Sequence, residues 1–418
     1  MKISVIGLGY IGLPTATMFA SRGVEVLGVD TNSVVVRTVN DGRIHIVEPE
    51  LDALVSTSVQ RGFLRAALAP EPADAFLIAV PTPFKDGNEP DLAYVEAAAR
   101  SVAKVLARGN VVILESTSPV GATERLVEWM ATERPDLRFP VENGGETDVH
   151  VAYCPERVLP GHVVRELVEN DRVIGGLTPT CSERAKELYR TFVEGELVTT
   201  SARTAEMCKL TENAYRDVNI AFANELSIIC DDLGIDVWEL IRLANRHPRV
   251  EILRPGCGVG GHCIAVDPWF IVSKSPRQAR LIRTAREVND GKPHWVVQRI
   301  LDELAGLSVA SGREPGQMRV ACYGLAFKPN IDDLRESPAI EVVSELAGAL
   351  NSEVFVVEPH IETGASELQG VELVGLRHAL ESADLNVILV AHDAFKEAGL
   401  FDGSEVLDFT GILGGKGR

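Results

Sequence analysis

A glycine-rich turn near the start of the chain constrains the fold more than any other feature. Residues 7–12 have the sequence GLGYIG, with the apolar run 3–6 before them and a helical pattern over 13–21 after them. A second apolar run covers residues 24–29 and ends in Asp30. The order of strand, glycine turn, helix, strand and acid is the context that a dinucleotide-binding α/β unit requires. We therefore predict a doubly wound parallel sheet that starts with the first apolar run.

Each glycine of this turn has its own role in a dinucleotide site. Gly7 makes the turn, Gly9 lets a pyrophosphate approach the helix N-terminus, and Gly12 allows the helix to pack closely on the strand. Asp30, 18 residues after Gly12, would accept hydrogen bonds from the adenosine ribose. Because an acid here repels a 2′-phosphate, the pattern favours NAD over NADP. The competing interpretation is a glycine-rich turn that binds no ligand.

Two further apolar runs, residues 74–80 and 110–114, predict more parallel strands of the same sheet. Ligands of open α/β sheets bind beyond the carboxyl ends of the strands. Thr82 follows the first run, and Thr117 and Thr123 follow the second. All three are therefore candidates for contacts with a cofactor or with reacting groups, with ordinary turns and helix caps as the alternative.

The run 151–154 predicts another strand, and the loop after it carries Glu156 next to Arg157. An acid beside an arginine at a strand end indicates a binding or reaction site. The alternative is a surface ion pair between the two neighbours, which would contribute little to stability.

An unusually long helical pattern covers residues 200–234. About 30 residues in a helix span about 45 Å, which suits a connection between two domains. Polar and apolar residues spaced by four, three, four and four share one face of it, namely Lys209, Asn213, Arg216, Ile220 and Asn224. Such a face is not a simple core stripe, and a solvated face is the alternative.

A second glycine-rich stretch, residues 256–268, has the sequence GCGVGGHCIAVDP. Neither a helix nor a regular strand uses glycine so densely, so the loop must let backbone come close to something. It carries a thiol, Cys263, and a carboxylate, Asp267. The loop alone leaves two interpretations open: a covalent nucleophile, or a buried cysteine that acts as a small apolar residue.

The last part of the chain repeats the order of the first. Strands and one helix are predicted at residues 319–323, 337–350, 354–357 and 384–391, with the last as the counterpart of 74–80. The glycine turn is degraded, because Lys328 and Pro329 replace its later glycines. We predict a second Rossmann-like domain that binds a different ligand, with Lys328 and Arg335 as its cationic contacts.

Charge, the length of the apolar runs and the cysteine spacing argue against nucleic-acid binding, a membrane span, a disulfide framework and a metal site. The net charge of −19 disfavours nucleic acid, because phosphate binding needs a basic surface. The apolar runs are far too short to span a membrane, and the glycines of residues 7–12 would interrupt a signal peptide. The seven cysteines form no CxxC pair, so neither a disulfide framework nor a metal site is predicted. We expect a cytoplasmic protein.

These pieces fit one class of reaction. A thiolate adds to an aldehyde, the thiohemiacetal passes hydride to NAD, and water cleaves the resulting thioester. Starting from an alcohol requires a group that assists loss of the hydroxyl proton. Lys209 is the candidate, as a base or as a stabiliser of the alkoxide, with Asn213 as its hydrogen-bond partner. Asp267 would orient Lys209 or a water, and the backbone N–H groups of residues 258–261 would aid binding.

The chain resembles the UDP-sugar/GDP-mannose 6-dehydrogenases from end to end. The matching motifs are GLGYIGLP at 7–14, PER at 155–157, AE…K…N at 205–213, GGHC…D at 260–267 and GLAFK…DD…RESP at 324–338. The resemblance implies oxidation of the C6 alcohol of a nucleotide sugar to a carboxylate with two NAD+ and an active-site cysteine. It also implies a homodimer or higher homo-oligomer joined through the central helical region.

Within the family, residues 153–161, 245–249 and 263–270 resemble the branch that oxidises UDP-N-acetyl-D-mannosamine to UDP-N-acetyl-D-mannosaminuronic acid. UDP-glucose dehydrogenases usually have a small residue and a lysine where this chain has His262 and Val266, which argues against UDP-glucose. The UDP-N-acetylglucosamine 6-dehydrogenases share the His-Cys-Ile element and remain the alternative. Two further hypotheses are a non-catalytic nucleotide-sugar sensor and a two-electron alcohol dehydrogenase.

The resemblance implies a role for each matching position. NAD contacts are expected from Tyr10, Ile11, Asp30, Thr82, Thr123 and Arg335. UDP-sugar contacts are expected from Arg157, Val158, Lys209, Asn213, Arg216, Gly260, Phe327 and Lys328, and from His247 and Arg249, supplied by a partner subunit. Cys263 would be the nucleophile and Lys209 the acid/base residue. Glu156 and Thr117 match positions linked to thioester hydrolysis and its water, and Cys257 would allow an oxidative disulfide.

The predicted fold is therefore α/β, with two Rossmann-like doubly wound domains joined by a long central helix. The expected parts are an NAD-binding domain at 1–198, a central helical region for dimerisation and catalysis at 199–305, and a UDP-sugar-binding domain at 306–418. A helical pattern over residues 278–290 predicts the element that leads out of the central region.

Overall fold

The computed structural model describes residues 1–46, 48–85, 87–140, 145–158, 161–350, 354–361, 370–397 and 399–414. Leu159 and Pro160, which belong to one of the motifs that resemble the family, lie outside the described residues. The chain divides into two compact units, Met1–Glu212 and Asn213–Arg418.

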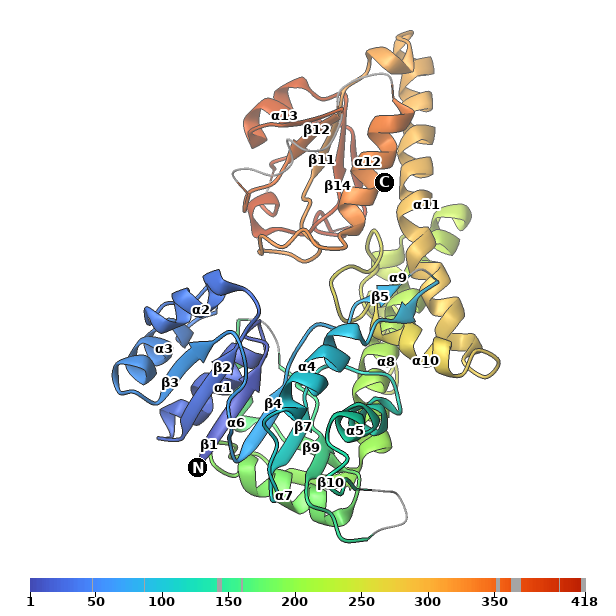
Figure 1. Ribbon diagram of the computed structural model, residues 1–418. Helices are drawn as coiled ribbons and strands as arrows, with labels where there is room; N and C mark the ends of the chain where they lie inside the picture. The colour runs from blue at the N-terminus through green and yellow to red at the C-terminus, as the bar shows by residue number, and fades with distance from the viewer. Residues whose placement is uncertain are drawn as a thin grey trace. The chain divides into compact units, whose positions relative to one another are not determined.

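Eight strands form the sheet of the first unit (Figure 1). In spatial order they are β10 (Leu197–Ser201), β9 (Arg172–Gly176), β8 (His150–Tyr153), β7 (Val111–Leu114), β4 (Ala75–Ile78), β1 (Lys2–Ile6), β2 (Glu25–Val29) and β3 (Leu64–Ala67). Neighbouring strands run parallel, except that β8 and β9 run antiparallel. The carboxyl ends of β1, β2, β4, β7 and β8 therefore lie along one edge. A short hairpin, β5 (Phe84–Lys85) and β6 (Glu89–Pro90), follows β4.

Helices cover both faces of this sheet, because side chains alternate along each strand. Ile3 and Val5 of β1 pack in the core on one face, whereas Ile6 packs in the core on the other. The first core includes α1 (Gly12–Ser21), α2 (Ser33–Asn40), α3 (Leu51–Gln60), α6 (Val163–Glu169) and α7 (Pro179–Tyr189). The second includes α4 (Ala93–Ala103) and α5 (Ala122–Glu133). The doubly wound sheet predicted from the glycine turn is confirmed.

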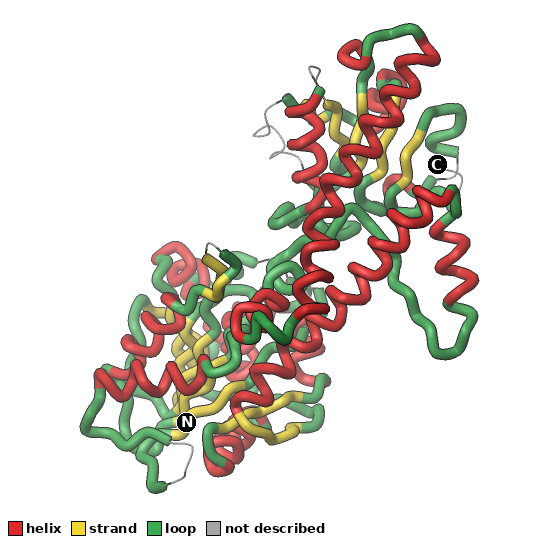
Figure 2. The backbone as a smooth tube through the Cα atoms, turned by 90° about the vertical axis from the view of Figure 1, so that its right-hand side faces the viewer, coloured by secondary structure: helices red, strands yellow, loops and turns green. Residues whose placement is uncertain are grey.

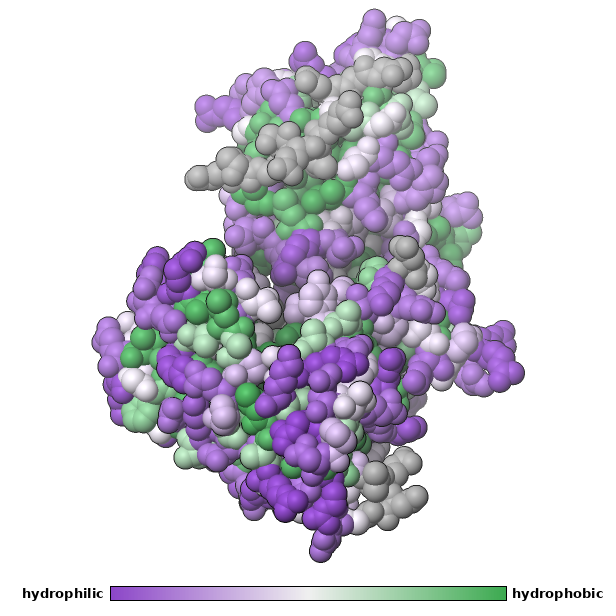
Figure 3. Space-filling view, in the orientation of Figure 1, coloured by the Kyte–Doolittle hydropathy of each residue, from purple (hydrophilic) through white to green (hydrophobic). Residues whose placement is uncertain are grey.

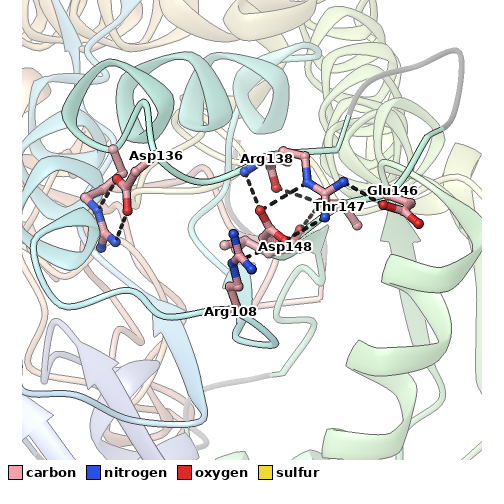
Figure 4. Close-up of polar contacts among 8 residues, drawn as sticks. Arg108, Asp136, Arg138, Glu146, Thr147 and Asp148 are labelled. Carbon is pink, nitrogen blue, oxygen red and sulfur yellow. Dashed lines mark hydrogen bonds and ion pairs between the residues drawn. The ribbon is translucent and has the colours of Figure 1, made fainter.

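A network of ion pairs holds the start of β8 (Figure 4). The side chains of Arg138 and Arg108 point toward Asp148, which lies two residues before this strand. The Asp148 carboxylate accepts hydrogen bonds from the backbone N–H of Arg138 at 2.9 Å and from its Nη2 at 3.0 Å. These bonds lower the pKa of Asp148 to about 2. The opposite end of β8 leads into the loop that carries Glu156.

The second unit starts within a long helix, as the pattern over residues 200–234 predicts. This helix, α8 (Ala202–Leu233), begins in the first unit, and α9 (Val237–Ala244), α10 (Asp267–Lys274) and α11 (Arg280–Ser311) follow it (Figure 1). The helices are red in Figure 2. A short 3-10 turn, η1 (Pro315–Gln317), leads from α11 to the second sheet.

Five parallel strands form the second sheet. In spatial order they are β13 (Val371–Leu373), β12 (Val354–Val357), β11 (Val320–Tyr323), β14 (Leu385–Ile388) and β15 (Val406–Asp408). The arrangement β13-β12-β11-β14 repeats β3-β2-β1-β4 of the first unit, which confirms the predicted second Rossmann-like fold. α11 and α12 (Pro338–Ala349) pack on one face, and α13 (Leu376–Ser382) and the turn η3 (Asp393–Phe395) pack on the other.

Helix α11 continues far beyond the predicted segment 278–290. Gly291 and Pro293 indicate an end in the sequence, since proline removes a hydrogen bond from a helix interior. Pro293 nevertheless lies inside the helix. Val296, Val297 and Ile300 beyond it are fully buried in the core of the second sheet, so tertiary packing outweighs the local preference.

Hydrophilic residues occupy much of the molecular face drawn in Figure 3, as expected for a chain of net charge −19. Within the described part of the chain, no helix combines the length and the apolar character that crossing a bilayer requires.

Candidate active site

The glycine turn after β1 has the geometry of a dinucleotide site. A Cβ added to Gly12 would lie 1.8 Å from the backbone oxygen of Gly7, so only glycine fits there. Gly9 is exposed, with no atom within 4 Å of an added Cβ, which leaves room for a ligand. The Asp30 carboxylate accepts hydrogen bonds from the N–H groups of Leu8 (3.0 Å) and Asn32 (2.8 Å). Since a carboxylate has about four acceptor positions, Asp30 can still accept from a ribose. The residues present fit NAD.

Two of the predicted threonines meet at the carboxyl ends of β4 and β7. The hydroxyl of Thr82 donates to the backbone oxygen of Thr117 at 2.6 Å. Both side chains are partly exposed. Tyr10 is exposed and Ile11 is half-buried in the turn after β1, whose neighbour in the sheet is β4. The sheet therefore brings these predicted contacts to one edge.

Thr123 is not at the surface of the first unit. Its side chain is fully buried, and its hydroxyl donates to Glu206 Oε1 at 2.6 Å. Glu206 also accepts hydrogen bonds from the N–H groups of Gly121 (2.7 Å) and Thr123 (2.8 Å), so it caps the start of α5 from α8. Burial raises the pKa of this carboxyl. Sequence reasoning missed this role, because 83 residues separate Glu206 from Thr123.

Glu156 and Arg157 do not form the surface ion pair that was the alternative for them. The Glu156 side chain is buried, and its carboxylate accepts a hydrogen bond from Arg172 at 2.9 Å. The Arg157 guanidinium instead makes two contacts with Glu212 of α8, at 2.7 and 3.1 Å. Val158, the next residue, is half-buried. The partners Arg172 and Glu212 carry no local sequence signal, because they come from distant segments.

Helix α8 holds both ends of the glycine-rich loop in the second unit. Asn213 donates from Nδ2 to Asp267 Oδ2 at 2.5 Å, at the end of the loop. Eleven residues later, Asn224 accepts a hydrogen bond at 2.9 Å from the N–H of Gly256, at the start of the loop. The polar face of this helix is therefore not merely solvated. Its other polar members, Lys209 and Arg216, are half-buried and exposed respectively.

The glycines of this loop let it approach the loop after β11. A Cβ added to Gly260 would lie 2.4 Å from the backbone oxygen of Glu336 and 2.8 Å from Phe327 Cβ. Two predicted UDP-sugar contacts, Gly260 and Phe327, are thus neighbours. Cys263 is exposed on the same loop, and its backbone oxygen accepts a hydrogen bond at 2.9 Å from the N–H of the buried Asp267.

The two cysteines of the loop have different environments. Cys257 is buried in the core of the second sheet, and its thiol donates to the backbone oxygen of Leu389 at 3.6 Å. Burial raises its pKa to about 12. The interpretation as a small buried residue therefore applies to Cys257, whereas Cys263 is accessible. No disulfide joins the two thiols.

The second glycine turn differs from the first in what its acid does. Glu358, at the end of β12, accepts hydrogen bonds from the N–H groups of Leu325 (2.7 Å) and Ala326 (3.1 Å), as Asp30 does from Leu8. However, Glu358 is buried and its carboxylate lies 3.1 Å from Nε2 of the buried His392. Glu358 is therefore enclosed by the protein, whereas Asp30 at the first turn is partly exposed.

The remaining predicted cationic contacts are exposed. Lys328 and Arg335 lie in the loop after β11, where the Arg335 guanidinium donates to Asp333 at 2.6 and 2.8 Å. His247 and Arg249 are exposed after α9. Among the described residues, no group of three or more His, Cys, Asp and Glu side chains is arranged to hold a metal ion.

Three family models match the chain in order. The NAD binding domain of the UDP-glucose/GDP-mannose dehydrogenase family matches residues 1–193, its central domain matches 203–291 and its UDP binding domain matches 321–414. These matches agree with the glycine turn, the thiol loop and the second α/β sheet described above.

Curated relatives share most of their length with this chain. It is 64% identical over 395 residues to an NDP-N-acetyl-D-galactosaminuronic acid dehydrogenase of Ralstonia nicotianae. This match covers 94% of this chain and 92% of the relative. It is 63% identical over 395 residues to the UDP-N-acetyl-D-mannosamine dehydrogenase of Escherichia coli, which covers 94% of each. The solved UDP-D-ManNAc dehydrogenase of Pyrococcus horikoshii is 39% identical with a TM-score of 0.87, covering 99% of this chain and 96% of that one.

Proposed function

The chain belongs to the UDP-glucose/GDP-mannose dehydrogenase family and is an NAD-dependent oxidoreductase of UDP-sugars, and on that premise we propose that its substrate is UDP-N-acetyl-D-mannosamine. The product is UDP-N-acetyl-D-mannosaminuronic acid, formed by a four-electron oxidation at C6. The main observation that supports this chemistry is that Cys263 is exposed. It lies on a loop whose two ends form hydrogen bonds with Asn213 and Asn224. The Escherichia coli relative supports the choice of sugar.

The first oxidation converts the C6 alcohol to an aldehyde. Bound NAD+ supplies the hydride acceptor in both oxidations. Lys209 takes the hydroxyl proton or stabilises the developing alkoxide, since a half-buried amine can do either. Asn213 serves as a hydrogen-bond donor, and the bond from its amide fixes Asp267. The thiolate of Cys263 then forms a C–S bond to the aldehyde carbon, which gives a thiohemiacetal.

Loss of a hydride from the thiohemiacetal gives a thioester, which water cleaves. The water oxygen bonds to the carbonyl carbon, the C–S bond breaks, and the Cys263 sulfur leaves with the electron pair. Glu156 accepts the proton of that water, and Thr117 helps to hold the water. One alcohol, two NAD+ and one water thus become one carboxylate, two NADH and three protons.

The binding roles that we propose are those that the family resemblance implies. NAD is held by Gly7, Gly9, Tyr10, Ile11, Gly12, Asp30, Thr82 and Arg335, whereas the fully buried Thr123 acts through its hydrogen bond to Glu206. The UDP-sugar is held by Arg157, Val158, Lys209, Asn213, Arg216, His247, Arg249, Gly260, Phe327 and Lys328. The corresponding parts of the chain are 1–198 for NAD, 199–305 for dimerisation and catalysis, and 306–418 for the UDP-sugar.

Counting NADH per sugar tests this function directly. With limiting UDP-N-acetyl-D-mannosamine and excess NAD+, we expect two NADH and one uronic acid for each sugar consumed, because alcohol and aldehyde are oxidised in turn. Absorbance at the NADH band measures the NADH formed, and chromatography of the nucleotide sugars measures the uronic acid. One NADH per sugar with release of aldehyde would instead identify a two-electron dehydrogenase.

Further UDP-sugars define the specificity in the same assay. UDP-N-acetylglucosamine, the C2 epimer, is the first comparison. The Ralstonia relative makes an N-acetylgalactosamine derivative the second candidate substrate. We expect kcat/KM to be at least about tenfold higher for the mannosamine epimer, the size of one lost polar contact. A preference for another epimer would replace the proposed substrate, and no NADH with any UDP-sugar would indicate a sensor.

We also propose that the enzyme acts as a homodimer. Tyr215, Phe222 and Ile229 on α8 are spaced by seven residues, so they share one face of the helix. Their exposed fractions are 69%, 51% and 46%, although all three are large and apolar. A second copy of this chain would cover such a stripe, as apolar side chains favour burial.

The double variant Phe222→Glu/Ile229→Glu is expected to be monomeric, because two buried charges would oppose association. Light scattering coupled to size-exclusion chromatography measures the mass of the wild type and the variant. Exchanging Glu187, an exposed residue of α7 outside the proposed interface, for Gln is the control and should leave the mass unchanged. A double variant that keeps the wild-type mass would place the interface elsewhere.

A further inference from the structure

A buried cluster of ionisable side chains surrounds the partner of Glu156 in the first unit. Arg172 of β9 donates from Nη2 to Glu156 at 2.9 Å, and its Nη1 lies 3.9 Å from Oε1 of Glu115, which follows β7. The hydroxyl of Tyr189, from α7, donates to the same oxygen of Glu115 at 2.5 Å. The guanidinium carbon of Arg172 lies 4.8 Å from the centre of the Tyr189 ring. Neither Glu115 nor Arg172 has a role in the reaction described above.

Among the residues that the structure describes, this cluster buries two acids and one arginine. Exposed fractions are 2% for Glu115, 4% for Arg172 and 8% for Glu156. One carboxylate balances the guanidinium, and a second negative charge would be buried without a counter-ion, which is costly. Oε2 of Glu115 is buried and has no hydrogen-bond partner among the described residues. A buried oxygen without a hydrogen-bond partner costs less free energy in a neutral acid than in an ionised one.

The two acids differ in their hydrogen bonds. Both oxygens of Glu156 accept from N–H groups, one from Arg172 and the other from the backbone of Arg157 at 2.7 Å. Burial raises the pKa of Glu115 to about 7, and the positive charge of Arg172 opposes that rise. The N–H donors that stabilise a carboxylate charge are thus concentrated on Glu156. Glu115 has fewer such donors, and its burial disfavours the charged form.

We propose that Glu115 is a positioning residue that, as a neutral acid held by Tyr189, packs against Arg172 and leaves its guanidinium to orient the Glu156 carboxylate for thioester hydrolysis. This inference rests on the role proposed above for Glu156. This role gives a reason for the position of Glu115, a buried acid two residues before Thr117. Thr117 is the residue proposed above to hold the hydrolytic water.

The proposal has a pH dependence with a definite sign. The charged or titratable groups that face Glu115 are Arg172 from β9, Glu156 and Cys154 from the end of β8, and Tyr189 from α7. Below about pH 7 Glu115 is neutral and Arg172 serves Glu156 alone. As the pH rises through this range, the second negative charge competes for the guanidinium and weakens its hold on Glu156.

Two substitutions at Glu115 test this role. Glu115→Gln resembles the neutral acid in shape and charge but cannot ionise, whereas Glu115→Leu removes the polar contact. We expect the ratio of thioester hydrolysis rates, Glu115→Gln over wild type, to rise from about one at pH 6 to about fivefold at pH 9. We expect Glu115→Leu to slow hydrolysis about tenfold or more, as loss of a supporting contact does. Rapid quench with intact mass spectrometry then detects acyl-enzyme on Cys263 after a normal first NADH burst.

Matched variants separate the possible outcomes. Glu156→Gln must accumulate the same acyl-enzyme; if it does not, the role assigned to Glu156 fails, and this inference with it. If Glu156→Gln accumulates the adduct but Glu115→Leu does not, only the inference about Glu115 is overturned. Should Glu115→Leu fail to fold, a pH profile of Glu115→Gln identical to the wild type overturns it as well. Glu96→Gln, which changes a partly exposed acid that is hydrogen-bonded to Arg100, is the control and should follow the wild type throughout.

Discussion

Replacing Cys263 by serine is expected to abolish formation of the uronic acid, with a loss of about a thousandfold or more, because removing a nucleophile costs several orders of magnitude. A serine hydroxyl ionises far less readily than a thiol, so it forms neither the covalent adduct nor the thioester. Chromatography of the nucleotide sugars with NADH counting measures the loss. The exposed position of Cys263 also predicts that alkylation by iodoacetamide inactivates the enzyme.

Cys208→Ser is the matched control for this experiment. The Cys208 thiol is half-buried on α8 and donates to Glu212 at 3.7 Å, a bond that a serine hydroxyl can replace. We expect this variant to keep two NADH per sugar and nearly all of the wild-type rate. Full acid formation by Cys263→Ser would rule out covalent catalysis at this residue, and equal losses in both variants would point to a general loss of folding.

The variant Arg286→Met is expected to destabilise the second unit by about 3–5 kcal/mol, since it leaves a buried carboxylate without its counter-ion. Arg286 is 2% exposed, and its Nη1 donates to the fully buried Asp217 at 2.6 Å. Asn289, one turn along α11, donates to the same carboxylate at 2.8 Å and accepts from Asn224. The pair thus anchors α11 to the part of α8 that holds the glycine-rich loop.

Thermal unfolding measures this effect. For a unit of about 200 residues, each kcal/mol shifts Tm by roughly 2–4 °C, so a decrease of roughly 6–20 °C is expected. Arg242→Met, which breaks an exposed pair with Glu239, should change stability by less than about 0.5 kcal/mol. Adding Asp217→Leu to Arg286→Met should recover part of the loss, because no charge then remains buried alone. A Tm unchanged by Arg286→Met would contradict a stabilising role for the pair.

The residues around the chemistry were predictable to different degrees. The glycine turn with Asp30 and the loop with Cys263 and Asp267 are contiguous in sequence, so their spacing carries the prediction. The polar face of α8 was predictable as a face, because helical periodicity places Asn213 and Asn224 on one side. What this face binds was not predictable, since a helical pattern does not specify which loop packs against it.

Arg172, Glu206 and Glu212 were missed as partners for a common reason. Each forms its hydrogen bonds with a segment that lies 16 to 85 residues away in the chain. Neither residue type nor local spacing distinguishes such an acid or arginine from one on a solvated surface. Cys257 is the opposite case, because its glycine-rich setting resembled that of Cys263 although its side chain is in the core.

The sequence by itself determined the two Rossmann-like folds, the long helix that lies between them in the chain, the use of NAD and the choice of Cys263 as the proposed nucleophile. Those features depend on contiguous motifs and on the periodicities of strands and helices, which are local properties of a chain. Only the tertiary structure decided which cysteine is accessible, that Glu156 pairs with Arg172 rather than with its neighbour, and that α11 continues through Pro293. These depend on burial and on contacts between distant segments, where the free energy of packing outweighs local preference.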